Sequence, residues 1–139
     1  MTPGIAADPI FAAAHRRALD MSGPMLATYL KRELGRPLVA RVTNVHFANT
    51  VTRWTRGTEP NRYALNRMQM VATILFALEA GFREPGGAAR WIVLDNPHLG
   101  FRSPIDALGD GAFADVFAAA RACATNAKPR HPDASTSSA

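Results

Sequence analysis

Apolar residues recur along most of this chain at the three- and four-residue spacing of an α-helix. Leu26, Leu30 and Leu34 show the pattern most simply, because residues four apart lie on the same face of a helix. The same spacing predicts helices over residues 9–21, 22–34, 49–56, 60–80, 85–93 and 110–124, with short helices after Pro37 and Pro104. Runs of alternating β-branched residues, which would predict strands, are missing. The pattern therefore predicts an all-α fold.

Local signals mark where several of these helices begin and end. Asp8, Ser22 and Ser103 stand where an N-cap side chain accepts a hydrogen bond from the first helical turn. Pro9 and Pro104 suit the first helical position, where no backbone N–H is needed. Three of the predicted helices end at glycines, namely Gly35, Gly57 and Gly81. The predicted helix over residues 60–80 is apolar around much of its circumference, so we expect it to be the buried central element.

The stretch from 91 to 108 contains two prolines and a glycine, yet it keeps many apolar residues. Three of these residues are expected to fill the core: Trp91, Leu99 and Leu108. We expect Asn96, Phe101 and Arg102 to be exposed between them. Phenylalanine and arginine beside a turn are residue types that anchor protein interfaces. The alternative is that the apolar residues of this stretch only close a small helical core.

The net charge of +5 is unevenly distributed along the chain. Residues 1–67 contain ten Lys and Arg against four Asp and Glu, which gives +6, and residues 68–139 contain six against seven, which gives −1. A basic first half is typical of a region that binds a polyanion. The alternative is a solvated basic surface without a partner.

Residues 37–57 combine a short helix, a turn near Asn44 and a second short helix, which is the pattern of a helix-turn-helix. Asn44 suits the left-handed conformation that a tight turn needs. Val51 and Trp54 are three residues apart and are expected to pack inward. The residues then left to face outward, as candidate DNA-binding residues, are Asn49, Thr50, Thr52, Arg53 and Arg56. Arginine and asparagine form paired hydrogen bonds with guanine and adenine edges, and threonine contacts phosphates or thymine methyl groups.

The sequence "NTVTRWTRG" resembles the recognition helix of the Xre and phage-repressor class, which commonly ends in a Thr-Val-x-Arg-Trp-x-x-Gly pattern. Two departures concern the turn before it. The turn is one residue longer than is typical, and Asn44 or a neighbour replaces the usual turn glycine.

Residues 60–121 resemble the C-terminal toxin-binding domain of the Xre/MbcA/ParS antitoxin family. In that family a long helix is followed by a helix that ends at a tryptophan, a Pro-Asn pair, a leucine, a proline that begins a short helix, a glycine and a final helix. The matching residues in this chain are Trp91, Asn96, Leu99, Pro104, Leu108, Gly111 and Val116. The chain departs from the pattern in having Asp95-Asn96 with the proline at position 97, and in continuing beyond the final helix.

The resemblance implies an antitoxin that binds a RES-domain toxin, an NAD-consuming enzyme, and also binds the promoter of its own operon. It further implies a homodimer. Residues 1–59 would form the helix-turn-helix region, residues 60–125 a small helical toxin-binding and dimerisation domain, and residues 126–139 a disordered tail. The toxin-binding residues would be Asn96, Leu99, Phe101, Arg102, Ser103 and Pro104. An alternative is a stand-alone helix-turn-helix regulator whose second half only dimerises.

The sequence gives little support to an enzyme, a metal site or a cofactor. The histidines at positions 15, 46, 98 and 131 are far apart and lack metal-binding spacing. Cys123, the single cysteine, is expected to be a small buried residue, and it fits a cytoplasmic protein. We expect Asp106, Asp110 and Asp115 to be separate caps or solvated residues. The sequence contains no run of roughly eighteen apolar residues, which would predict a membrane span.

Overall fold

The computed structural model describes residues 8–81 and 86–127, and within these ranges the fold is all-α, as predicted. The helices are α1 (Pro9–Leu19), α2 (Gly23–Leu34), α3 (Arg36–Thr43), α4 (Ala48–Thr55), α5 (Arg62–Gly81), α6 (Gly87–Val93), α7 (Pro104–Gly109) and α8 (Phe113–Ala127), with a 3-10 turn, η1 (Pro97–Leu99). In the described ranges, the only β pairing is an isolated bridge between Asn96 and Arg102. None of the described helices is both long and apolar enough to cross a membrane.

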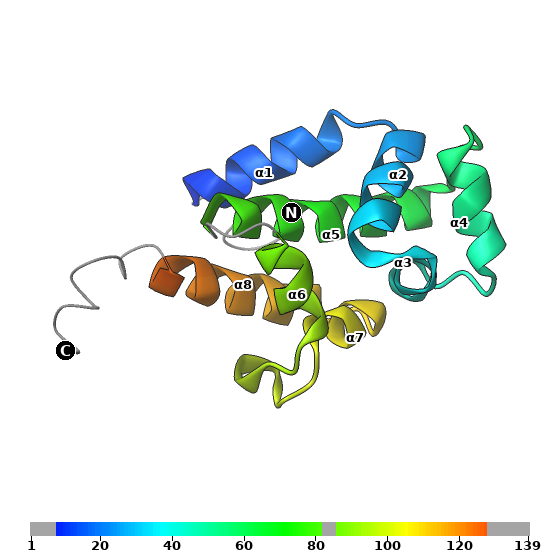
Figure 1. Cartoon of the computed structure of the whole chain (residues 1–139). Coiled ribbons are helices and arrows are strands. Elements are labelled where there is room, and N and C mark those ends of the chain that lie inside the picture. The colour runs from blue at the N-terminus through cyan, green and yellow to red at the C-terminus, as the bar shows by residue number, and fades with distance from the viewer. Residues whose placement is uncertain (1–7, 82–85, 128–139) are drawn as a thin grey trace, which may run out of the picture.

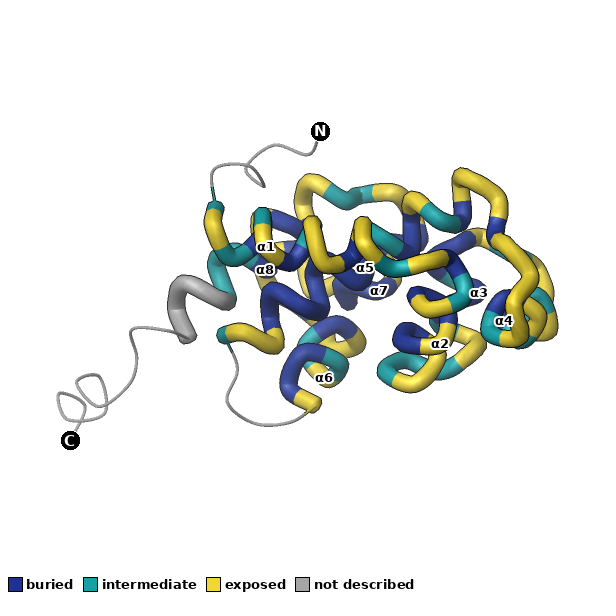
Figure 2. Tube along the Cα trace, turned by 90° about the horizontal axis from the view of Figure 1, so that it is seen from above, coloured by how far each residue is buried: buried dark blue, intermediate teal, exposed yellow. Residues whose placement is uncertain are grey.

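Helix α5 is the central element of the fold, as its apolar circumference predicted. Its residues 71–78 are all buried. Helix α1 lies along one side of α5, helices α2 to α4 gather around its amino end, and α6 to α8 lie on the other side (Figure 1). Figure 2 shows the same arrangement by burial, with α4 at the outer edge of the molecule.

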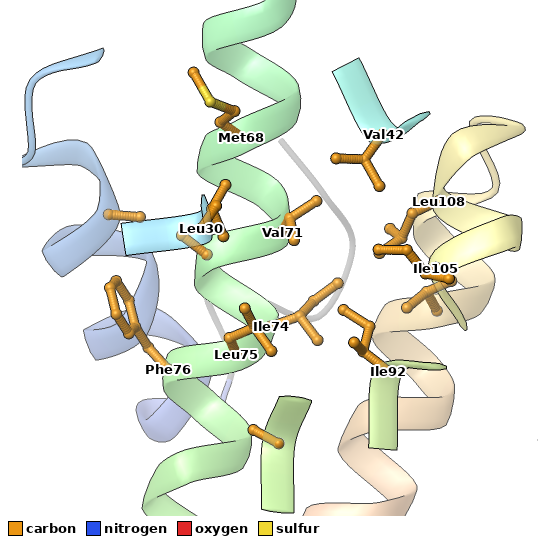
Figure 3. Close-up of a cluster of buried hydrophobic side chains, with 14 of the residues drawn as sticks. Leu30, Val42, Met68, Val71, Ile74, Leu75, Phe76, Ile92, Ile105 and Leu108 are labelled. Atoms are coloured by element: carbon orange, nitrogen blue, oxygen red, sulfur yellow. The ribbon is translucent and has the colours of Figure 1, made fainter. Parts of the chain in front are cut away.

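The hydrophobic core continues from the first half of the chain into the second. Leu30 and Val42 pack in one cluster with Ile74 of α5 and with Ile92 and Leu108 of the second half (Figure 3). Each of these five side chains is at most 1% exposed, and burying a side chain of this size contributes about 1.5–3 kcal/mol. The predicted boundary near residue 59 falls in the short connection between α4 and α5. The two halves on either side of this connection share one hydrophobic core.

The predicted caps are confirmed at three helix starts. Asp8 Oδ1 accepts hydrogen bonds from the backbone N–H groups of Ile10 and Phe11, at 3.0 and 3.3 Å. Ser22 Oγ accepts from the third residue after it at 3.2 Å, and Ser103 Oγ does the same at 3.3 Å. The cap of α5 was not predicted, because this helix was expected to begin at Pro60. It begins at Arg62, and Asn61 Oδ1 caps it by accepting from Ala64 N.

The last helix differs from its prediction at both ends. It begins at Phe113 instead of 110, because Asp110 closes α7 and Gly111 has a φ of 89°, which is incompatible with a helix. It extends to Ala127, so the predicted start of a disordered tail at residue 126 is wrong, and the rest of that tail, residues 128–139, lies outside the described residues. The predicted start of α6 near Pro85 also lies outside them.

Candidate functional site

The helices α3 and α4 are joined by a tight turn that Asn44 begins. Asn44 adopts the left-handed conformation, with φ 59° and ψ 35°, as predicted, and it closes α3. Its side-chain amide donates to the hydroxyl of Tyr63 at 2.6 Å. Because Tyr63 belongs to the first turn of α5, this hydrogen bond fixes the turn to the central helix.

Helix α4 is amphipathic, and its two faces are the predicted ones. Val51 and Trp54 are buried, at 0% and 4% exposure, and they hold α4 against the core. Asn49, Arg53 and Arg56 are exposed. The predicted inward packing of Val51 and Trp54 is therefore confirmed, and three of the five candidate DNA-binding residues are exposed.

The two candidate threonines of α4, Thr50 and Thr52, are half-buried, and each accepts a hydrogen bond from an arginine. Arg36, the first residue of α3, donates to Thr52 Oγ1 at 2.8 Å, and Arg53 donates to Thr50 Oγ1 at 3.4 Å. No carboxylate in the described ranges forms an ion pair with Arg53 or Arg56. The charge of this surface is therefore not neutralised by described neighbours.

The second candidate region, the segment 96–104, is folded into a compact loop. The backbone of Asn96 accepts from Leu99 and Phe101, and its N–H donates to Arg102 O at 3.1 Å. Gly100 and Phe101 are both left-handed, with φ values of 68° and 66°. A left-handed conformation is unusual for a large side chain and strains it, so the surrounding hydrogen bonds enforce the shape of this loop.

Most of the predicted partner-binding residues in this segment are buried. Four of the six are buried: Asn96, Leu99, Ser103 and Pro104. The expectation that Asn96 is exposed is wrong, because its side chain is turned inward and accepts from His98 N at 2.9 Å to cap η1. Phe101, at 68% exposure, and Arg102 are exposed, as predicted.

The expected core residues of the stretch 91–108 also divide. Leu99 and Leu108 are buried, as predicted, at 9% and 0% exposure. Trp91, by contrast, is only partly buried against the core. The large side chains that bury this stretch in the core are therefore Ile92, Leu99, Ile105 and Leu108.

Arg67 of α5 is a buried cation that links α3 to α7, the helices next to the two candidate regions. It is 8% exposed and donates to Val42 O at 2.5 Å, to Leu108 O at 2.6 Å and to Gly109 O at 3.0 Å. These carbonyls lie at the carboxyl ends of α3 and α7, where helix dipoles place partial negative charge. The rings of Tyr63 and Phe113 also lie about 5 Å from the guanidinium carbon.

Arg67 was not predicted, although the sequence contains a signal for it. It is the one charged residue in the otherwise uncharged span 63–78 of a helix expected to be buried. A charge in such a place needs buried partners. Its partners are 25, 41 and 42 residues away along the chain, so the sequence alone does not identify them.

A second arginine link between the halves lies at the surface. Asp110 accepts from Arg41 of α3 at 3.2 Å and from Arg102 at 3.0 Å, and Asp106 lies 3.8 Å from Arg41. Asp106 and Asp110 are exposed, and Asp110 closes α7, which agrees with the expectation of caps or solvated residues. Their shared contact with Arg41 was not predicted, and it arises because α7 is packed against α3. A Cβ atom at Gly109 would collide with the Arg41 guanidinium, so glycine leaves room for this contact.

Other reactive groups contribute little to these two regions. Cys123 is half-buried against the core, and burial raises the pKa of its thiol, which lowers the fraction of reactive thiolate at neutral pH. Within residues 8–81 and 86–127, no group of three or more His, Cys, Asp and Glu side chains could hold a metal ion.

Comparison with known proteins gave no match to a family model, to a curated protein or to a solved structure. The molecule has two candidate binding surfaces, the exposed face of α4 and the 96–104 segment. The face of α4 carries arginine side chains without a described carboxylate partner.

Proposed function

We propose that the protein is an antitoxin that represses its own operon through α4 and neutralises a RES-domain, NAD-consuming toxin through its second half. The observation that carries the proposal is the α4 surface. Arg53 and Arg56 extend into solvent without a described carboxylate partner, on a helix that Val51 and Trp54 anchor to the core. Such an amphipathic second helix in a basic helix-turn-helix suits the major groove of DNA.

The chemistry of the α4 surface favours DNA over other polyanions. Arginine donates two parallel hydrogen bonds to guanine O6 and N7, and asparagine pairs with adenine N6 and N7. Asn49 and Arg53 are four residues apart and therefore lie on one face of the helix. A surface that only attracted charge would not need an asparagine in this position.

The proposal for the toxin partner rests on the family resemblance and on two exposed residues. Phe101 and Arg102 project from a loop whose other predicted binding residues are buried. Aromatic and arginine side chains at fixed positions are common centres of protein interfaces. The left-handed backbone of Phe101 also supports a binding role, because residues with a strained backbone cluster at binding sites.

The DNA part is tested by titrating the double variant Arg53→Ala/Arg56→Ala against the promoter DNA upstream of the gene. We expect affinity to fall at least about 30-fold, because two paired base contacts are lost and each is worth about 1–3 kcal/mol. If the two arginines contact phosphates instead, the slope of log affinity against log salt should fall by about 1.8. The matched control is Arg16→Ala/Arg121→Ala, which removes the same charge from α1 and α8. Equal behaviour of the two double variants would remove Arg53 and Arg56 from the DNA surface.

The toxin part is tested by co-expressing the protein with a RES-domain protein encoded beside it. We expect the two to co-purify and growth to be rescued, and Phe101→Asp to abolish both without changing the helical circular dichroism. Leu19→Asp, at an exposed apolar residue of α1, serves as the control. Promoter binding without any RES-domain partner would instead favour a stand-alone helix-turn-helix regulator.

A further inference from the structure

Phe47 is the most exposed large hydrophobic residue in the described ranges, at 72%. It lies in the turn between α3 and α4 and immediately precedes the first residue of α4. Its ring is 6.4 Å from the ring of His46, which is also exposed, so no core residue covers it. An aromatic side chain left in solvent at this place forgoes the stabilisation that burial would provide.

The position that Phe47 occupies makes the choice of residue more unusual. Phe47 is the N-cap of α4, with extended φ and ψ of −125° and 131°, and it makes no side-chain cap hydrogen bond. Polar side chains cap other helices of this protein: Asp8, Ser22, Asn61, Asn96 and Ser103. A polar residue at position 47 would stabilise α4 in the same way. Stability therefore does not account for phenylalanine here.

We propose that Phe47 is a specificity-determining residue that packs against the C5-methyl group of a thymine in the DNA major groove. The inference rests on the proposed DNA binding by α4. In helix-turn-helix complexes the amino-terminal residues of the recognition helix contact the base edges. The thymine methyl is the apolar group on those edges, and phenylalanine is among the side chains that contact it. Phe47 lies at that end of α4, beside the exposed Asn49.

The contact differs from those of Arg53 and Arg56 in one measurable respect. An apolar contact releases no counterions, so removing it lowers affinity without changing the salt dependence of binding. Removing a phosphate-binding arginine lowers both. The variant Phe47→Ala should therefore keep the wild-type slope of log affinity against log salt.

The experiment uses duplexes that the full-length protein selects from a randomised DNA library. In a selected duplex, each thymine is replaced in turn by deoxyuridine, which removes only the C5-methyl group. We expect one or two positions at which this change weakens wild-type binding about fourfold, as the loss of one buried methyl group would. Phe47→Ala should bind the thymine duplex more weakly and should not distinguish thymine from uracil at those positions. Phe47→Leu should retain part of the distinction.

The matched control is Phe101→Ala, at the other exposed phenylalanine, which is 68% exposed and lies outside the helix-turn-helix. It should discriminate thymine from uracil as the wild type does. If the wild type selects a sequence but no uracil substitution matters, or if Phe47→Ala keeps the full discrimination, the role of Phe47 is wrong and DNA binding stands. A selected sequence without thymine overturns it equally. If the wild type selects no sequence at all, DNA recognition by α4 fails, and the role of Phe47 fails with it.

Discussion

Helix α4 and the 96–104 segment were both predicted to bind partners, but their predicted binding residues differ in exposure. In α4 and its C-cap Arg56, none of the five predicted residues is buried, and Val51 and Trp54 between them face the core. In the 96–104 segment four of the six predicted residues are buried, and only Phe101 and Arg102 are exposed. The comparison shows that a helix makes the exposure of its residues predictable, whereas an irregular loop does not.

The reason is the regularity of the backbone. In a helix the direction of each side chain follows from its position in the sequence, so burying Val51 and Trp54 leaves Asn49 and Arg53 on the outside. In the loop the direction of Asn96 depends on hydrogen bonds closed within the loop itself, including the cap to His98 N. A polar residue there can serve the backbone instead of a partner.

The largest effect is expected from Arg67→Met, which removes the buried hydrogen bonds that link α3 to α7. It would leave the carbonyls of Val42, Leu108 and Gly109 buried without their donor, and we expect the free energy of unfolding to fall by about 3 kcal/mol. Urea unfolding measures the change. Arg62→Met, at an exposed arginine of the same helix, should change it by less than about 0.5 kcal/mol. A loss below about 1 kcal/mol for Arg67→Met would mean that the buried hydrogen bonds of Arg67 contribute little to holding α3 and α7 together.

Smaller effects are expected from alanine substitutions that test whether the buried polar residues of the 96–104 segment stabilise the fold. Asn96→Ala and Ser103→Ala should each lower the free energy of unfolding by about 1 kcal/mol, because each removes an N-cap. Asn49→Ala, in the exposed face of α4, should leave it within about 0.5 kcal/mol of wild type. Thermal and urea unfolding give both values. If Asn49→Ala were as destabilising as the other two, the contrast between the regions would disappear.

Phe101→Gly should stabilise the protein. A left-handed backbone costs a side chain with a Cβ atom about 1–2 kcal/mol, and glycine avoids this, although its freer unfolded chain offsets part of the gain. We expect a net gain of about 0.5–1 kcal/mol in urea unfolding. Phe101→Ala keeps the Cβ atom and should show no such gain. A glycine variant no more stable than the alanine variant would show that the loop is unstrained at this residue.

The smallest effect is expected from Asp110→Asn, which removes the surface link between Arg41 and Arg102. Both ion pairs involve side chains that are about 40–50% exposed, so water screens them. The loss should be below about 1 kcal/mol in low salt. It should vanish at 1 M salt, where charges are screened within about 3 Å. A loss that persists at high salt would instead assign Asp110 a role as the C-cap of α7.

The sequence alone determined the helices, most of their caps and the two faces of α4, because these depend on residues within a few positions of one another. The left-handed turn at Asn44 and the caps at Asp8, Ser22 and Ser103 belong to this class. Such local features follow from backbone geometry and side-chain spacing.

Only the tertiary structure decided which distant residues meet. Arg41 and Asp110 are 69 residues apart, and Arg67 reaches carbonyls of two helices that come before and after it in the chain. These contacts exist because burying the apolar faces of α3, α5 and α7 in one core brings their polar edges together. The local pattern of apolar residues does not specify these contacts. Hydrophobic stabilisation depends on the apolar area that is buried, and not on which distant residues become neighbours.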